Sequence, residues 1–122
     1  MKRLLFICLA FVLMSFNEVV TAVVAAFEKG DANKISSYFD NSIGIKPPGE
    51  FEFRIQPKQQ AAAWLNTFYV EKNITGFEQI GINDIEGYTI IQGKLLSGSR
   101  KYSISIRINK VGDGYKIASI KF

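Results

Sequence analysis

The chain has 122 residues, of which 48% are hydrophobic and 21% are charged, and its formal net charge is +4. This length and composition predict one globular domain with its own core and exclude a disordered or fibrous chain. Histidine is absent. Its absence excludes a histidine-based catalytic triad, imidazole acid–base catalysis near neutral pH and the commonest metal ligand.

The N-terminus has the pattern of an export signal. Lys2 and Arg3 precede an apolar run of eleven residues, Leu4–Met14, whereas a helix that spans a membrane needs about 20. We therefore predict a cleaved signal peptide over residues 1–16 and a single domain over residues 17–122, with an uncleaved anchor as the alternative.

The cleavage site is less well defined than the apolar run. Small residues that suit cleavage occur at Ser15 and at Val20–Thr21–Ala22, but the second site lies within the next predicted helix. The only cysteine, Cys8, lies inside the apolar run, so no disulfide forms within the mature chain.

Charge is distributed unevenly after the predicted signal. Residues 17–86 contain six basic and ten acidic residues, and residues 87–122 contain seven basic residues and one acidic residue. The favoured interpretation is that these bases form the solvated face of an antiparallel sheet. The alternative is a surface that meets an anionic partner.

Two helices are predicted at the start of the domain. The apolar spacing of Val20, Val23, Val24 and Phe27 predicts an amphipathic helix, which Gly30 ends. Asp31 is the predicted N-cap of a second helix, Ala32–Phe39, which buries Ile35, Tyr38 and Phe39. Asp40 follows as the residue that terminates this helix.

A short hairpin and a third helix come next. Ser42–Lys46 is a predicted strand that Pro47 and Pro48 stop. Apolar residues then alternate with charged ones, which predicts a second strand with one buried face formed by Phe51, Phe53 and Ile55. Pro57 suits the first turn of a helix that runs to about Lys72, with a buried stripe of Ala61, Trp64, Leu65 and Phe68.

The remainder of the chain predicts a meander of strands. Strands are expected at Gly76–Asn83, at Tyr88–Leu96, around Ile104–Ile108 and at Tyr115–Phe122, with a hairpin turn at Asp113–Gly114. Helices followed by strands predict an α+β fold. We expect three N-terminal helices packed on a curved, mainly antiparallel sheet of four to six strands.

The segment VVTAVVAAFEKGDANKISSYFDNSIGI resembles the opening of the nuclear transport factor two-like superfamily, which includes ketosteroid isomerases. It shares an amphipathic helix, the Gly30–Asp31 break and the Phe39–Asp40 pair before a short strand. The resemblance covers the predicted domain and implies a cone-shaped, cystatin-like fold. More narrowly, the chain is similar to small exported bacterial members that have no assigned function.

The resemblance also implies where isomerase chemistry would lie. Such a site needs a carboxylate base on the first strand and an oxyanion donor, commonly a tyrosine, in the first helix. The base position aligns with Lys46–Pro47 and the tyrosine position with Val23. None of these residues performs either role, so we predict no catalytic residue. The mature chain has no histidine or cysteine and no pair or triad of acids spaced for a metal, so we also predict no metal site and no cofactor.

The other acidic residues have structural interpretations. Asp40 would need burial to act as a base, and helix termination is the favoured role. Glu50 and Glu52 alternate with aromatic residues and are expected to face water. Asp84 and Glu86 flank a predicted turn.

Five aromatic residues are the candidate lining of a cone pocket, with simple core filling as the favoured alternative: Phe39, Phe53, Trp64, Phe68 and Tyr102.

Three functions fit these observations. The first is a non-catalytic exported domain that binds a small apolar ligand or a protein partner. The second is a divergent isomerase or dehydratase that uses a carboxylate buried in the cone. The third is a structural module of the cell envelope with a basic sheet face.

We expect export to the periplasm or envelope of a bacterium, no nucleic-acid partner and membrane contact only through the export signal. The open sheet face would carry Ser103, Ser105 and Arg107, which is polar for a stable dimer, so a monomer or a weak homodimer is expected.

Overall fold

A computed structural model describes residues 16–122 of the chain. The predicted signal peptide, including Cys8, therefore lies outside the described residues except for Phe16. The helices are α2 (Phe16–Lys29), α3 (Ala32–Ser36) and α4 (Lys58–Glu71). The strands are β1 (Phe39–Lys46), β2 (Arg54–Pro57), β3 (Gly76–Ile85), β4 (Tyr88–Ser97), β5 (Arg100–Val111) and β6 (Gly114–Lys121).

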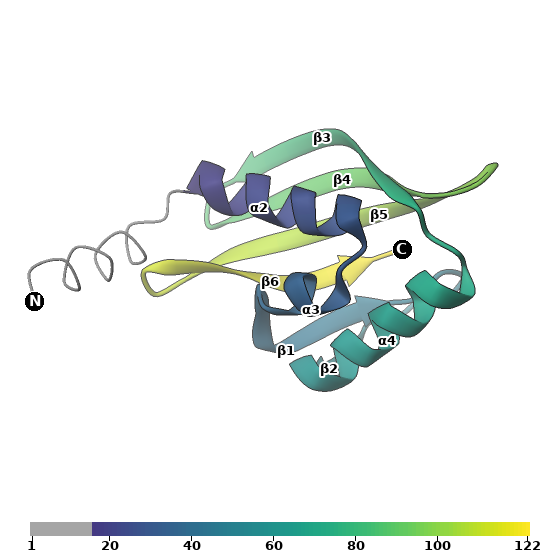
Figure 1. Ribbon diagram of the computed structural model, residues 1–122. Coiled ribbons are helices and arrows are strands. Elements are labelled where there is room, and N and C mark those ends of the chain that lie inside the picture. Colours follow the sequence, from purple (N-terminus) through teal and green to yellow (C-terminus); the bar gives the residue numbers. More distant parts are fainter. Residues whose placement is uncertain (1–15) are drawn as a thin grey trace, which may run out of the picture.

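The six strands form one curved sheet in the order β2-β1-β6-β5-β4-β3. Strands β1 and β6 are parallel neighbours and the other pairs are antiparallel. Helices α2, α3 and α4 gather on one face of this sheet, as Figure 1 shows. The predicted α+β cone is thus confirmed, with six strands. No helix within residues 16–122 is long and apolar enough to cross a membrane.

The break between the first two helices forms as the sequence predicts. Gly30 adopts a φ of +67°, which glycine tolerates best, and so it ends α2. The Asp31 carboxylate accepts a hydrogen bond from the backbone N–H of Lys34 at 3.2 Å and caps α3. This capping bond satisfies one of the free donors at the start of α3.

The predicted extension of the second helix to Phe39 is wrong. Helix α3 ends at Ser36, because the hydroxyls of Ser36 and Ser37 bond back to the carbonyls of Asn33 and Lys34. Phe39 opens β1 instead and pairs with Ile117 of β6. The gain of sheet pairing over residues 39–46 outweighs the local helical pattern.

Asp40 is therefore not a helix terminator. It is the second residue of β1 and is half-buried. Its carboxylate Oδ1 accepts the backbone N–H of Asn41 at 2.8 Å. The pairing of β1 with β6 is irregular between Phe39 and Gly44, and this local bond serves a backbone N–H within that irregular stretch. The role remains structural, but in a strand.

The prediction of a buried face at residues 51–55 is also wrong. Phe51 is 93% exposed, Phe53 is 45% exposed and Ile55 is 73% exposed. Strand β2 begins only at Arg54 and lies at the edge of the sheet. Alternation of apolar and charged residues shows that the two faces of a strand differ, but it does not show which face is covered by the rest of the protein. Of the two acids, Glu52 is exposed, whereas Glu50 is half-buried and pairs with Arg54 at 2.6 Å.

Helix α4 begins directly after Pro57, which ends β2 and precedes the first helical turn instead of lying in it as predicted. The helix buries Ala61, Leu65 and Phe68, while Trp64 is only partly buried. A further residue of this helix, Tyr69, is buried and donates its hydroxyl to the carbonyl oxygen of Phe27 at 3.2 Å. Burial raises the pKa of Tyr69 well above its usual range. This bond joins α4 to the C-terminal end of α2.

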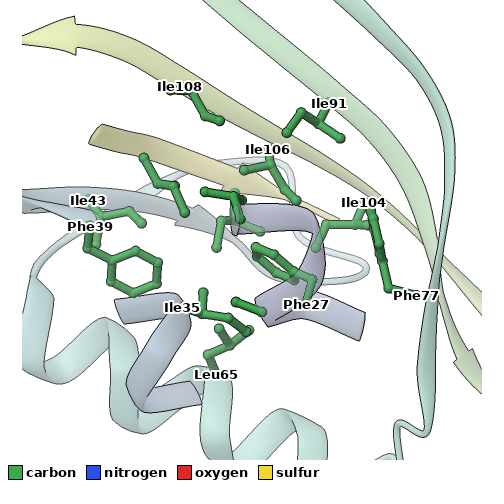
Figure 2. Packing of buried hydrophobic residues seen from close by; sticks show 14 of the residues in the cluster. Phe27, Ile35, Phe39, Ile43, Leu65, Phe77, Ile91, Ile104, Ile106 and Ile108 are labelled. Atoms are coloured by element: carbon green, nitrogen blue, oxygen red, sulfur yellow. The ribbon is translucent and has the colours of Figure 1, made fainter. Parts of the chain in front are cut away.

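The core fills the space between the helices and the sheet. Figure 2 shows Phe27, Ile35 and Leu65 of the helices directed toward the isoleucines of the sheet. The predicted alternation of β5 is confirmed, because Ile104, Ile106 and Ile108 are buried. The twelve largest side chains that are less than 2% exposed are Val23, Phe27, Ile35, Ile43, Ile45, Leu65, Ile91, Leu95, Ile106, Ile108, Ile117 and Ile120.

Candidate functional site

The interior of the cone contains almost no polar chemistry. All eleven acidic residues of the chain lie within residues 16–122, and none of them is buried. Within this range Thr89 is the one buried polar or charged residue, and its hydroxyl donates to Asp84 Oδ1 at 3.0 Å. Residues 16–122 also hold no group of His, Cys, Asp or Glu side chains arranged for a metal ion.

The positions aligned with isomerase residues point to other roles. Val23 is 1% exposed and belongs to the core. Pro47 is buried and Lys46 is half-buried, and Lys46 lies opposite Lys121 in the pairing of β1 with β6. Lys46 alternates with the core residue Ile45, so its side chain leaves the other face of the sheet.

Three of the five predicted pocket residues come together. The rings of Trp64 and Phe68 stack at 5.4 Å, and Tyr102 meets Phe68 edge-on at 5.5 Å. Phe122 joins this cluster at 4.8 Å from Phe68. Beside the cluster is an open hollow of about 230 Å³ that Trp64, Phe68 and Pro48 help to line. The hollow is smaller than the usual pocket for a drug-sized ligand.

The other two predicted residues lie elsewhere. Phe39 is 2% exposed and is part of the core. A Cβ built on Gly44 would lie 3.3 Å from Phe53 Cδ1, 3.3 Å from Ile55 Cδ1 and 3.7 Å from the Cβ of Ser119. Phe53 and Ile55 therefore cover the side of Gly44 that faces away from the helices.

Larger grooves lie on the surface of the helical layer. One of about 680 Å³ runs between α3 and α4 and is lined by small residues, by amides such as Asn33 and Gln59, and by one acid and one base, Asp31 and Lys58. Another of about 540 Å³ lies between α2 and β3, where Val24 and Ile82 face it. Both are open to solvent and hold no convergent set of charged groups.

The outer face of the sheet, defined as the face opposite the helices, concentrates positive charge. Its side chains alternate with the buried ones of β4, β5 and β6. Among the regularly paired residues of this face, the one acidic residue is Glu78, which forms an ion pair with Lys101 at 3.6 Å. Six basic residues share the face: Lys46, Lys94, Lys101, Arg107, Lys116 and Lys121. Six positive charges less one negative leave a net charge of +5.

Arg107 lies near the middle of the outer face. Its guanidinium carbon is 3.8 Å from the ring centroid of Tyr88. Its Nε donates to Asn109 Oδ1 at 3.0 Å. The stacking and the hydrogen bond fix the plane of the guanidinium, so less side-chain entropy is lost when it binds an anion.

Sequence reasoning detected the basic C-terminal segment and the outward positions of Ser103, Ser105 and Arg107, which the structure confirms. It did not connect Lys46 with Lys121, because a parallel pairing between strands far apart in sequence leaves no local pattern. The alternation of Phe53 and Ile55 with charged residues also predicts their burial in the core. The edge position of β2 was needed to correct this.

The chain has the fold of the class of nuclear transport factor two-like and cystatin-fold proteins. A cystatin-fold protein from Novosphingobium aromaticivorans superposes with a TM-score of 0.66 at 15% identity, covering 86% of this chain and 94% of that one. A nuclear transport factor two-like protein from Anabaena variabilis gives 0.58 at 14% identity, covering 84% and 80%.

Within that class, the chain belongs to the family described as "Domain of unknown function (DUF4783)", which matches residues 20–122. A member of this family from Bacteroides ovatus superposes with a TM-score of 0.76 at 21% identity, covering 82% of this chain and 89% of that one. No curated protein matches the chain.

Proposed function

We propose that the chain is a non-catalytic binding domain that recognises a protein partner through its surface. The observation that carries the proposal is the filled, uncharged interior. Twelve large apolar side chains are less than 2% exposed, and none of the acidic residues is buried. A general base in the cone needs a buried carboxylate whose pKa is raised, and the divergent-enzyme alternative lacks that group.

The same observation favours a protein partner over a small apolar ligand. Ligand pockets usually enclose most of the ligand surface within a cavity. Here the centre of the cone is occupied by Phe27, Leu65 and Ile106, and the hollow at the aromatic cluster is about 230 Å³ and open. The exposed apolar residues Phe53 and Ile55 instead lie on the surface, where a protein can cover them.

Thermal unfolding with apolar ligands tests this proposal. We expect palmitate, a steroid and naphthalene each to leave the Tm of the domain unchanged within about 1 °C. A ligand at a hundred times its Kd would stabilise the fold by about 2.7 kcal/mol and raise the Tm by several degrees. A saturating rise in Tm with any of the three would contradict the proposal.

We further propose that the domain is exported to the periplasm or envelope and that the signal peptide, predicted above to end at Phe16, is cleaved one residue earlier, after Ser15. The basic and apolar N-terminal pattern supports export. The ring of Phe16 lies 5.2 Å from that of Tyr115, and Phe16 packs against the core as a partly buried residue. Cleavage after Ala22 would remove the buried residues Val19 and Val20 from α2.

The intact mass of the protein secreted by its own host checks this prediction. We expect the mass of residues 16–122. A mature chain that begins at Val23, or a protein that retains Met1–Ser15, would contradict it.

A further inference from the structure

We propose that the outer face of the sheet binds an acidic segment of a partner protein that also carries apolar side chains. The inference rests on the proposed function, because it names the surface and the chemistry of that protein partner. Three features of the outer face carry it: uncompensated positive charge, a preorganised arginine and an adjoining apolar edge.

The positive charge is not neutralised within the domain. Lys46 and Lys121 lie directly opposite each other on β1 and β6, and like charges in that relation destabilise a sheet. Apart from Lys101, the bases of this face form no ion pair with any residue in 16–122. A merely solvated face usually mixes charges of both signs. The uncompensated charge is therefore complementary to an anionic partner.

The arrangement around Arg107 suits carboxylates. Lys116 pairs with Asn109 and Lys121 pairs with Ser105, so each lysine lies diagonally beside Arg107 on the neighbouring strand. Diagonal neighbours across a sheet are about 7–8 Å apart, which places three cations within reach of one short acidic segment. The held guanidinium plane allows two-point contact with a carboxylate.

An apolar edge continues from this cationic centre. One register row runs from Arg107 through Ser119 and Gly44 to Ile55. Ser119 has a small side chain and Gly44 has none, so the sheet surface is open at these two positions. Beyond them, Phe53 and Ile55 project from the sheet and are 45% and 73% exposed. A segment lying along the row would place acidic groups at Arg107 and apolar groups at Ile55.

Charge also distinguishes between the possible binding partners of the outer face. A second copy would oppose this face with its own net charge of +5, which Coulomb repulsion disfavours. An acidic protein segment has no such conflict, because it can meet both the bases and the apolar pair of Phe53 and Ile55. Binding to an anionic bilayer is an outcome that the test below distinguishes.

Fluorescence anisotropy with two defined peptides tests the proposal. The first probe is a fluorescein-labelled peptide of repeating Asp-Phe-Glu-Leu, and the second replaces Phe and Leu by Ser. We expect the full domain to bind the first peptide more tightly. Raising salt from about 0.05 M to about 0.5 M should weaken both complexes, since exposed charges are screened.

Matched variants locate the binding surface. Lys121→Glu and Arg107→Gln should each weaken binding of the first peptide by about fivefold or more. Lys58→Glu is the control, because it reverses the charge of one exposed lysine on the helical side of the domain, as Lys121→Glu does on the outer face. It should change the Kd for the first peptide by less than about twofold. Ile55→Thr should weaken binding of the first peptide and leave that of the second unchanged. Circular dichroism confirms that each variant is folded.

Several results would overturn the inference. Absence of peptide binding would do so, as would an equal loss in Lys58→Glu and Lys121→Glu, which would indicate a response to net charge alone. Preferential binding to phosphatidylglycerol vesicles over the peptide would assign the face to a membrane. These outcomes would not contradict the proposed function. That proposal fails separately, if an apolar ligand raises the Tm of the domain.

Discussion

Replacing Gly93 by alanine should destabilise the domain by about 3 kcal/mol and lower its Tm by about 12 °C. A Cβ at Gly93 would lie 2.5 Å from two ring atoms of Phe77 and 2.6 Å from the carbonyl oxygen of Glu78. The Phe77 ring can turn away, but the Glu78 oxygen belongs to the backbone of the paired strand β3. Strands β3 and β4 must therefore separate locally. Urea unfolding monitored by circular dichroism measures the loss.

Gly81→Ala is the matched control for this substitution. Gly81 lies in β3, has no atom within 4 Å of a built Cβ and has no positive φ. Alanine there should change the free energy of unfolding by less than about 1 kcal/mol, since it restricts only the unfolded chain. A Gly93→Ala variant as stable as Gly81→Ala would contradict the close packing of β3 on β4 at Gly93.

Removing the ring of Phe27 should cost about 3–5 kcal/mol. Phe27 is fully buried at the end of α2, and its ring lies 5.7 Å from that of Phe77. The helices and the sheet both pack around it, so the space left by Phe27→Ala cannot close without moving either layer. Chemical denaturation measures the change, and Phe27→Leu, which retains most of the volume, should lose less than about 1.5 kcal/mol. Equal stability of Phe27→Ala and wild type would contradict a packed core.

The sequence predicted most of the fold because local patterns agree with the final structure. The spacing of Val20, Val23 and Phe27 and the Gly30–Asp31 break define α2 and the start of α3. The alternation of β5 gives both its buried face and its outward Ser103, Ser105 and Arg107. In these segments the local preference and the tertiary environment favour the same structure.

The errors occurred where long-range pairing decides the structure. Phe39 has a helical context, yet pairing with Ile117 draws it into β1. Phe53 and Ile55 have a strand-like alternation, but β2 is at the sheet edge and nothing covers them. Gly93 carries a local indication of its environment, because an isolated glycine within a strand often marks a close approach of another chain segment.

The candidate surface was predictable only in part. The excess of bases after residue 87 is visible in the sequence, and strand alternation places Lys94 and Arg107 on one face. The position of Lys46 beside Lys121, and of Ile55 at the end of the Arg107 row, depends on strand order. Strand order is a tertiary property that no short-range pattern contains.

A filled cone is the central claim, and Phe27→Ala provides its most direct test. Thermal unfolding of wild type and variant is measured with and without benzene, which has the shape of the deleted ring. An apolar cavity of that kind binds benzene. We predict that benzene at about ten times its Kd stabilises Phe27→Ala by about 1.4 kcal/mol and leaves the wild-type Tm unchanged. Stabilisation of the wild-type domain by benzene would contradict the claim, because it would show that the interior already has a vacant apolar site.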